Sequence, residues 1–474
     1  MNRRHFLAAM AAAPLAAQNK TKPNVILILL DDLGWRDFGV YGSQHYETPE
    51  LDRLAREGAR FTQAYAACPV CSPTRASIMT GKYPARLHLT DWIPGRKQWP
   101  ASKLLRLEFE QQLPLAETTI AEVLRPQGYR TASVGKWHLG GGDFTPDHQG
   151  FDRNVGGDQR GGIGSFFGPF PGPGLEQTTK DDYIGDTLTA AAEKFIEESA
   201  KAKQPFFVYL PHYLTHLPLS AKPGLIDKYK TKFAGKGDWP NPVYAAMVEH
   251  FDQSLGHLRK KLDELGIAKE TVLIVTSDNG GLRHEGANKR LITDNSPLRA
   301  GKGHVYEGGI REPLVVCWPG VTKPGTVHDA QVCSIDLLPT IAEICGARVT
   351  AKVDGLSYAG LLRGGAPPRR DALYWHYPHY SNQGGPPAGA VRRGDWKLIE
   401  FYEDGRLELF NLKEDLSETR NLIDKEPKRA AELHELLKKW RSDVNAAMPA
   451  VNPNYDPAKA DQGLAGAEKP TPPV

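Results

Sequence analysis

Residues 25–32 read Val-Ile-Leu-Ile-Leu-Leu-Asp-Asp, six apolar residues followed by two carboxylates. A strand with one solvated face alternates apolar and polar residues, whereas this run is apolar throughout. The run therefore predicts a strand that is buried on both faces, as in a parallel sheet. Similar short apolar runs recur at 131–135, 206–210, 272–276 and 314–317.

Stretches with helical periodicity lie between these strands. They occur at 48–58, 115–128, 183–202, 243–265 and 336–346. Strands that alternate with helices are typical of an α/β fold. We therefore expect a large, mostly parallel (mixed) sheet sandwiched by helices.

The pattern changes near residue 350. The runs 391–401 and 406–412 alternate, and the turn sequence Glu-Asp-Gly-Arg at 403–406 separates them, which predicts an antiparallel hairpin. A helix rich in Lys, Glu and Leu follows at about 427–444. The expected organisation is a main domain over 22–346, a smaller C-terminal α+β subdomain with a short antiparallel sheet over 350–448, and an extended tail over 449–474.

The composition is that of a globular protein. The 474 residues are 40% hydrophobic and 24% charged, and 59 Lys and Arg against 56 Asp and Glu give a net charge of +3. These values exclude fibrous and wholly disordered chains. Nucleic acid is not an expected partner, because nucleic-acid-binding proteins concentrate basic residues on one face.

The N-terminus has the features of an export signal. Arg3 and Arg4 precede an apolar stretch over 6–17 that is shorter than the roughly 20 residues needed to span a bilayer. We expect a signal peptide over 1–17, either twin-arginine or ordinary secretory, and the alternative is a frayed terminus. The export machinery is then a partner, and the mature protein is periplasmic or extracellular with no membrane span.

Polar residues follow two of the expected strands. Asp31 and Asp32 directly follow the first, and Asp278 and Asn279 follow the run 272–276 after Ser277. Ligands of α/β sheets gather at the carboxyl ends of strands, and a divalent cation removes the repulsion between adjacent carboxylates. Oxygen ligands alone select a hard cation, Ca²⁺ in preference to Mg²⁺. The alternative is that these residues cap helices or turns.

Residues 71–81 read Cys-Ser-Pro-Thr-Arg-Ala-Ser-Ile-Met-Thr-Gly. This element resembles the signature of the type I, formylglycine-dependent sulfatases of the alkaline-phosphatase superfamily. In that family a formylglycine-generating or sulfatase-maturating enzyme reads the Cys-x-Pro-x-Arg core and oxidises the cysteine to 3-oxoalanine (Cα-formylglycine). The resemblance implies the same fate for Cys71. On spacing alone, Cys68-x-x-Cys71 is also compatible with a redox pair or half a zinc site.

Three further elements resemble parts of the family pattern. Lys136-Trp-His138 matches its Lys-x-His element, and Gly-Lys302-Gly matches the element that supplies a second lysine. The latter lacks the spacing of a P-loop. His216 follows the strand at 206–210, and its His-x-Pro context favours it over the neighbouring His212.

The resemblance implies hydrolysis of a sulfate monoester. A hydrated formylglycine at position 71, bound to the metal ion and held by Arg75, attacks sulfur. Lys136 and Lys302 neutralise sulfate oxygens, and Lys302 and His216 protonate the departing alcohol. His138 then removes a proton from the second hydroxyl, which expels sulfate. The implied metal ligands are Asp31, Asp32, Cys71 as formylglycine, Asp278 and Asn279.

The substrate is expected to be a sulfated carbohydrate, although an aryl sulfate needs the same catalytic groups. An aromatic stretch over 374–380 suits a sugar ring or, alternatively, forms a packing seam between the subdomains. Two rival functions are a phosphate or phosphonate monoester hydrolase of the same superfamily and a non-catalytic binder of sulfated glycans. The candidate substrate-binding residues are His376, His379, Arg392, Trp92 and Arg96.

Overall fold

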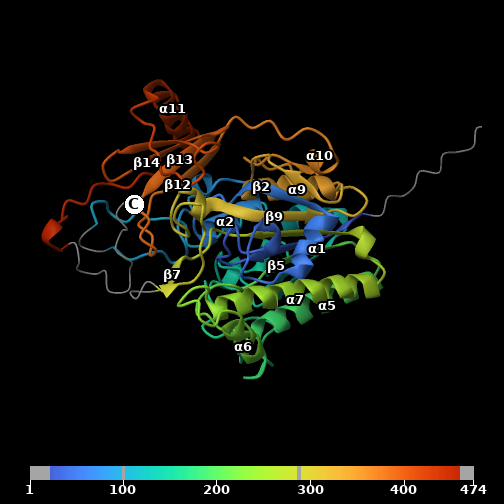
Figure 1. The fold of residues 1–474 in the computed structure, drawn as a ribbon. Coiled ribbons are helices and arrows are strands. Elements are labelled where there is room, and N and C mark those ends of the chain that lie inside the picture. Colours follow the sequence, from blue (N-terminus) through green and yellow to red (C-terminus); the bar gives the residue numbers. More distant parts are fainter. Residues whose placement is uncertain (1–21, 99–101, 286–289, 460–474) are drawn as a thin grey trace, which may run out of the picture.

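A nine-stranded mixed sheet forms the centre of the molecule (Figure 1). The computed structural model describes residues 22–98, 102–285 and 290–459. The strand order is β10-β2-β9-β6-β1-β5-β3-β4, with β11 beside β2. The strands from β6 to β4 are parallel, and β9 is antiparallel to both β6 and β2. The strands are β1 (Asn24–Leu30), β2 (Ala59–Tyr65), β3 (Arg130–Val134), β4 (Arg153–Val155), β5 (Phe206–Pro211), β6 (Thr271–Ser277), β9 (Arg311–Cys317), β10 (Thr326–His328) and β11 (Val332–Cys333).

Helices cover both faces of this sheet, which confirms the predicted fold class. Alternate side chains of β1 enter opposite cores: Ile26 and Ile28 pack in one, Val25 and Leu27 in the other. Helices α1, α5, α6 and α7 cover the first face, whereas α2, α4, α9 and α10 cover the second. Their bounds are α1 (Pro49–Glu57), α2 (Cys71–Thr80), α4 (Ile120–Leu124), α5 (Ile184–Lys201), α6 (Pro223–Lys232), α7 (Pro242–Glu264), α9 (Leu337–Ile344) and α10 (Ala359–Leu362).

A four-stranded antiparallel sheet follows, in the order β12-β13-β14-β15. Helix α11 packs on it, and its inner face shares a hydrophobic core with residues that flank α2, such as Val70. The elements are β12 (Leu373–Tyr377), β13 (Ala388–Arg393), β14 (Trp396–Phe401), β15 (Leu407–Asn411) and α11 (Pro427–Asp443). The remaining short α-helices and strands are α3 (Pro84–Leu87), β7 (His284–Glu285), β8 (Arg290–Leu291) and α8 (Glu307–Ile310).

Two predicted elements differ in the structure. The single strand expected over 391–401 is two strands, because the chain reverses at Gly394, where φ is 57°. The helix expected over 115–128 is only α4, which starts at the capping residue Thr119 and gives way at Arg125 to a 3-10 turn that contains Pro126.

The expected signal peptide, 1–17, lies outside the described residues, as does part of the expected tail. Within the described ranges, no helix is long and apolar enough to cross a membrane.

Candidate active site

Four oxygen-bearing side chains meet where two parallel strands end. Because Leu30 of β1 lies opposite Ser277 of β6, the residues that follow the two strands become neighbours. The backbone N–H of Asp32 donates to Oδ1 of Asp278 at 3.3 Å, and Asn279 donates to Oδ1 of Asp32 at 2.8 Å. The predicted juxtaposition of these carboxylates is present in the structure.

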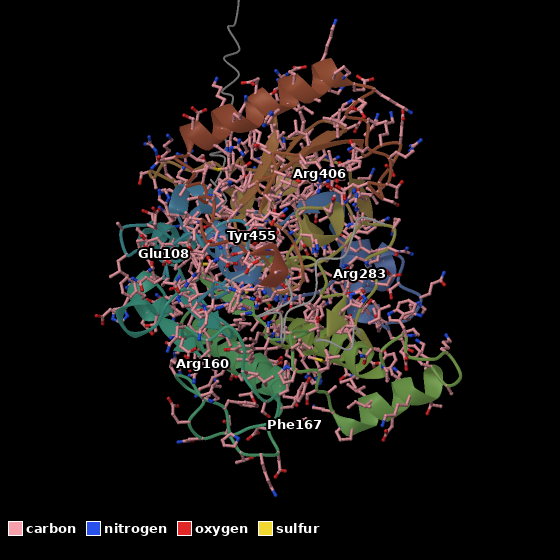
Figure 2. All side chains as sticks on the ribbon, turned by 90° about the vertical axis from the view of Figure 1, so that its left-hand side faces the viewer. Glu108, Arg160, Phe167, Arg283, Arg406 and Tyr455 are labelled. Atoms are coloured by element: carbon pink, nitrogen blue, oxygen red, sulfur yellow. The ribbon has the colours of Figure 1, made fainter. Side chains whose placement is uncertain are left out.

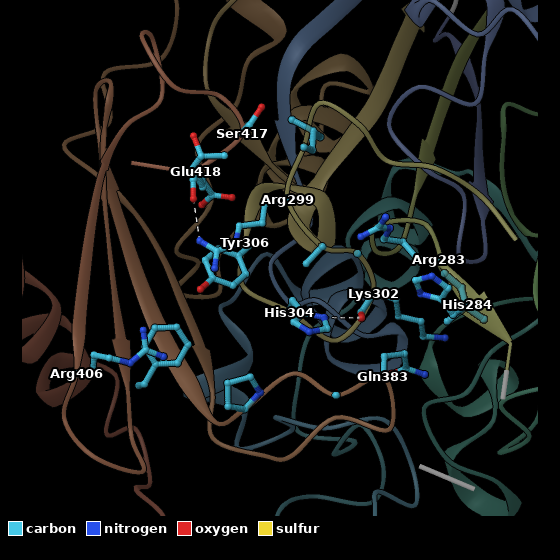
Figure 3. A pocket seen from close by; sticks show the side chains of 18 of the residues that line it. Arg283, His284, Arg299, Lys302, His304, Tyr306, Gln383, Arg406, Ser417 and Glu418 are labelled. Atoms are coloured by element: carbon cyan, nitrogen blue, oxygen red, sulfur yellow. Dashed lines mark hydrogen bonds between the residues drawn. The ribbon is translucent and has the colours of Figure 1, made fainter. Parts of the chain in front are cut away.

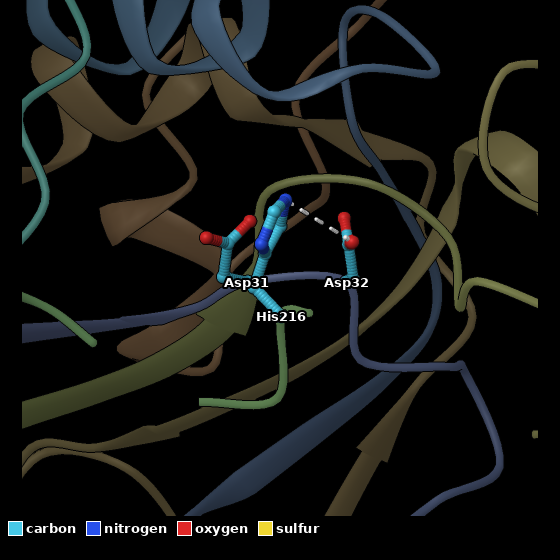
Figure 4. Close-up of side chains that lie close together, drawn as sticks. All are labelled: Asp31, Asp32 and His216. Atoms are coloured by element: carbon cyan, nitrogen blue, oxygen red, sulfur yellow. Dashed lines mark ion pairs between the residues drawn. The ribbon is translucent and has the colours of Figure 1, made fainter. Parts of the chain in front are cut away.

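Two oxygens of this group have no hydrogen-bond donor among the described residues. They are Oδ1 of Asp31 and Oδ1 of Asn279, and both are buried. A buried polar atom without a partner is costly, and a cation would satisfy both of these acceptors. Asp31, Asp32 and His216 also offer ligand atoms within 4.8 Å of one another (Figure 4). Apart from His216, the available donors are oxygen atoms, which fit a hard divalent ion.

Cys71 is the first residue of α2 and faces His138. Its Sγ lies 3.4 Å from Nδ1 of His138, whose Nε2 lies 2.7 Å from the carbonyl oxygen of Ile93. A carbonyl only accepts, so Nε2 carries the proton and Nδ1 presents its lone pair to position 71. Burial and the charge of Lys136 hold the pKa of His138 well below its usual value, and burial raises the pKa of the Cys71 thiol. Both groups are neutral.

Arg75 lies one helical turn beyond Cys71 and is fully buried. Its Nε and Nη2 donate to Oδ2 of Asp278 at 3.0 and 2.7 Å, and its Nη1 donates to the carbonyl of Lys136 at 2.8 Å. Burial and the neighbouring Asp31 raise the pKa of Asp278 to about 6, against the opposing charge of Arg75. The guanidinium therefore orients the carboxylate and offsets its burial.

Two lysines complete the charged cluster. Lys136 Nζ lies 2.6 Å from Oδ2 of Asp31, and Lys302 Nζ lies 2.6 Å from Oδ1 of Asp32. Burial alone would raise the pKa of Asp32, but the charges of Lys302, His216 and Lys136 outweigh it and hold that pKa below its usual value. Burial alone would lower the pKa of Lys302, and Asp32 reverses this shift.

The structure brings together all ten residues that the sequence placed in the metal and catalytic groups. His216, rather than His212, lies beside the carboxylates: its Nε2 is 3.8 Å from Asp32, while its Nδ1 donates to the carbonyl of Leu217 at 2.8 Å. His212 is buried against Phe251 in the core.

Comparison with known proteins identifies the family. The sulfatase family model matches residues 23–347. This chain belongs to the sulfatase family. A second model, the C-terminal part of N-sulphoglucosamine sulphohydrolase, matches residues 300–444. The chain is thus a sulfuric ester hydrolase, and members of its family use a formylglycine and a divalent metal.

Several relatives match this sulfatase over most of their length. A sulfatase of Formosa agariphila is 31% identical and covers 93% of either chain. Human arylsulfatase A is 34% identical over 85% of this chain and 78% of its own. Among solved structures, Ps i-CgsB in complex with k-i-k-neocarrahexaose is 29% identical, covers 89% of this chain and 93% of its own, and superposes with a TM-score of 0.76.

The five candidate substrate-binding residues lie outside the charged cluster of the sulfatase. Both ring nitrogens of His376 are engaged, with the Tyr402 hydroxyl at 2.8 Å and the Ala447 carbonyl at 2.9 Å. Arg392 is buried against Tyr65 and Gln63. These two residues have no polar group turned toward a ligand, which matches the alternative of a packing seam.

The other three candidates are Trp92, Arg96 and His379. Trp92 and Arg96 flank Ile93, the residue whose carbonyl holds His138, and Arg96 donates to the Ser381 carbonyl at 3.2 Å. His379 is buried, and its Nε2 lies 2.8 Å from the Thr90 hydroxyl.

Sequence reasoning missed two features that shape this site. The Ile93 carbonyl fixes the tautomer of His138, but a backbone atom leaves no trace in residue type. A Cβ at Gly161 would lie 2.6 Å from the His138 ring, so only glycine permits this close approach. The glycine-rich stretch that begins at Gly161 was the available signal.

Proposed function

We propose that this sulfatase removes sulfate from a sulfated carbohydrate, with a formylglycine made from Cys71 as nucleophile and Ca²⁺ as metal. The observation that carries the proposal is the cluster itself: Cys71 faces a neutral His138 beside carboxylate and amide oxygens that lack a donor. The oxygen-only, irregular ligand set favours Ca²⁺ over Mg²⁺. The ligands would be Asp31, Asp32, Asp278, Asn279 and the modified residue 71.

The class of substrate comes from relatives. Mouse N-acetylgalactosamine-6-sulfatase is 31% identical over 78% of this chain. The structure of Ps i-CgsB holds an oligosaccharide, k-i-k-neocarrahexaose. Both point to a sulfated sugar.

The bound groups would supply a nucleophilic hydroxyl at position 71 and a Lewis acid that lowers its pKa. Around them, the ammonium groups of Lys136 and Lys302 neutralise sulfate oxygens as charge moves toward the leaving oxygen. Arg75 stays fixed on Asp278 and adds a positive charge beside position 71.

Proton transfers fall to three residues. Nδ1 of His138 accepts a proton from position 71, because Nε2 is committed to the Ile93 carbonyl. Lys302 is protonated beside Asp32 and donates toward the leaving oxygen. Nε2 of His216 points toward the same carboxylate. Because Nδ1 carries the proton that is donated to the Leu217 carbonyl, Nε2 can donate a proton only when the imidazole is protonated on both nitrogens.

Production in a host with a maturating enzyme tests this proposal. Peptide mass spectrometry across residue 71 should show the aldehyde or its hydrate, and elemental analysis should show about one calcium per chain. The protein should release sulfate from sulfated saccharides and from p-nitrophenyl sulfate. Faster hydrolysis of p-nitrophenyl phosphate, or full activity with an intact thiol, would contradict it.

A further inference from the structure

A cavity of about 610 Å³ adjoins the charged cluster (Figure 3). It lies between the segments around Arg283 and Lys302 and the C-terminal sheet, and Figure 2 looks onto the side of the molecule where Arg283 and Arg406 lie. Lys302 belongs to both places, since it lines the cavity and its Nζ reaches Asp32. A substrate held at the cluster therefore has room to extend into this cavity.

The wall nearest the cluster is basic. Arg283, His284, Lys302 and His304 all line it. Nδ1 of His304 faces the Lys302 carbonyl at 3.2 Å. Burial, together with the positive charges of Arg283 and Arg299, lowers the pKa of His304. The half-buried guanidinium of Arg283 has no hydrogen bond or ion pair with any described residue. An unpaired guanidinium in a concave site favours an anion.

The other guanidinium groups of the cavity are occupied. Arg299 donates to the Glu418 carbonyl at 2.8 Å and covers the Tyr306 ring, with its Cζ 3.9 Å from the ring centre. Arg406 pairs with Glu408, and its Cζ lies 3.9 Å from the centre of the Phe401 ring. Both rings are also buried, so neither offers a face on which a sugar ring can stack. Recognition in this cavity rests on charge and hydrogen bonds.

The opposite wall is polar, and its carboxylates are paired: Glu403 lies 3.9 Å from Nζ of Lys103, and Asp404 lies 4.0 Å from Nε of Arg406. Glu403 accepts from the Tyr380 hydroxyl at 2.6 Å, and Asp404 accepts from the backbone N–H of Arg406 at 3.0 Å. The basic wall, where the guanidinium of Arg283 has no partner among the described residues, is therefore the side that would hold an anionic ligand. Carboxylates there suit the hydroxyl groups of a sugar, which donate hydrogen bonds.

We propose that this cavity binds a second anionic group of the substrate, a sulfate ester or a carboxylate, through Arg283. The inference rests on the proposed function and sharpens it: the substrate is a saccharide with at least two negative charges. One is the sulfate that is cleaved, and the other is retained in the cavity.

Matched saccharide pairs test the proposal. Each pair shares the scissile sulfate, and one member carries in addition either a second sulfate or a uronate carboxylate. The wild-type enzyme should prefer the doubly charged member by about tenfold in kcat/KM, as expected for one charge-assisted contact. Arg283→Gln should reduce that ratio to near one, chiefly through KM. The sulfate and carboxylate arms show which group is bound.

Arg363→Gln is the matched control, because Arg363 is exposed and pairs with Glu343 on another surface. It should keep the wild-type ratio. Equal rates for both members of each pair in the wild-type enzyme, or an unchanged ratio in Arg283→Gln, would overturn the inference. Failure of the proposed function would give a different result from failure of this inference. In that case, protein that contains formylglycine and metal would release no sulfate from any saccharide.

Discussion

Arg75 and Asp278 form an ion pair in which neither side chain is exposed to solvent. Nε and Nη2 of the guanidinium both donate to the same carboxylate oxygen, Oδ2, at 3.0 and 2.7 Å. Oδ1 of Asp278 is therefore left to face Asp32, and it accepts a hydrogen bond from the backbone N–H of Asp32 at 3.3 Å. The pair therefore links helix α2, which carries residue 71, to the strand end that would hold the metal.

Asp278→Asn should remove both functions of this carboxylate. The amide keeps the shape but lacks the charge, so Arg75 becomes a buried cation without its main partner, which costs about 3–5 kcal/mol. We expect a substoichiometric metal content by elemental analysis and a fall in kcat of at least about 100-fold. Asp371→Asn is the control, since Asp371 is exposed and pairs with Arg393. Full calcium content in Asp278→Asn would show that the negative charge of Asp278 is not needed to hold the ion.

Cys71→Ala should abolish sulfate release and leave the fold intact. The Cys71 side chain contacts His138 at 3.4 Å and is buried at the start of α2, where alanine is a good helix former. The free energy of unfolding of the variant should lie within about 1–2 kcal/mol of the wild-type value, because only one small buried group is lost. Circular dichroism and urea unfolding monitor the fold. Turnover near the wild-type rate would refute the role of residue 71.

His138→Ala should lower kcat by about 10²–10⁴-fold through loss of a general base. In the wild type the imidazole acts in its neutral form, so activity falls as pH drops through its pKa. Burial and Lys136 hold that pKa well below 6.5, and the acid limb of the kcat profile should therefore lie below pH 6.5. His148→Ala, at an exposed histidine, should leave the profile unchanged. An acid limb centred at 6.5 or higher would contradict this assignment.

The strand ends and the charged cluster were predictable because their residue types carry the information. A continuous apolar run that ends in Asp31-Asp32 specifies a buried strand and a polar end, and parallel pairing brings the ends together. The motifs around Cys71, Lys136 and Lys302 resemble those of a known family, so their convergence was also expected.

The cavity and the packing of the C-terminal sheet were not predictable in the same way. Arg392 and His376 have residue types that suit a sugar site, yet tertiary contacts with Tyr65 and Tyr402 bury them. Arg283 lies outside every motif, and its unpaired state depends on which neighbours fold around it. Burial and pairing between distant segments are properties of the fold and not of local sequence.

Lys397→Met should destabilise the contact between the C-terminal sheet and the main domain. Lys397 Nζ lies 3.0 Å from Glu307 and 2.9 Å from Glu418, and none of the three side chains is exposed. Removing the cation takes from Glu418 its buried counter-charge, whereas Glu307 keeps Arg311 at 3.3 Å. Breaking such a buried pair costs up to about 3–5 kcal/mol. Urea unfolding measures the loss. Lys425→Met, at an exposed lysine, should change the free energy of unfolding by less than about 0.5 kcal/mol.

Glu418→Gln should change how stability depends on pH. Burial raises the pKa of Glu418 to about 7 in the folded protein, against the charge of Lys397, whereas an unfolded Glu titrates near 4.5. Between these values the folded state binds the extra proton, so the contribution of Glu418 to stability is complete below pH 4.5 and is lost as pH rises to 7. Glutamine does not titrate. Relative to the variant, the wild type should therefore lose free energy of unfolding between pH 5 and pH 7.5 in urea titrations. A constant difference between the two proteins across this range would show that Glu418 is already ionised at pH 5.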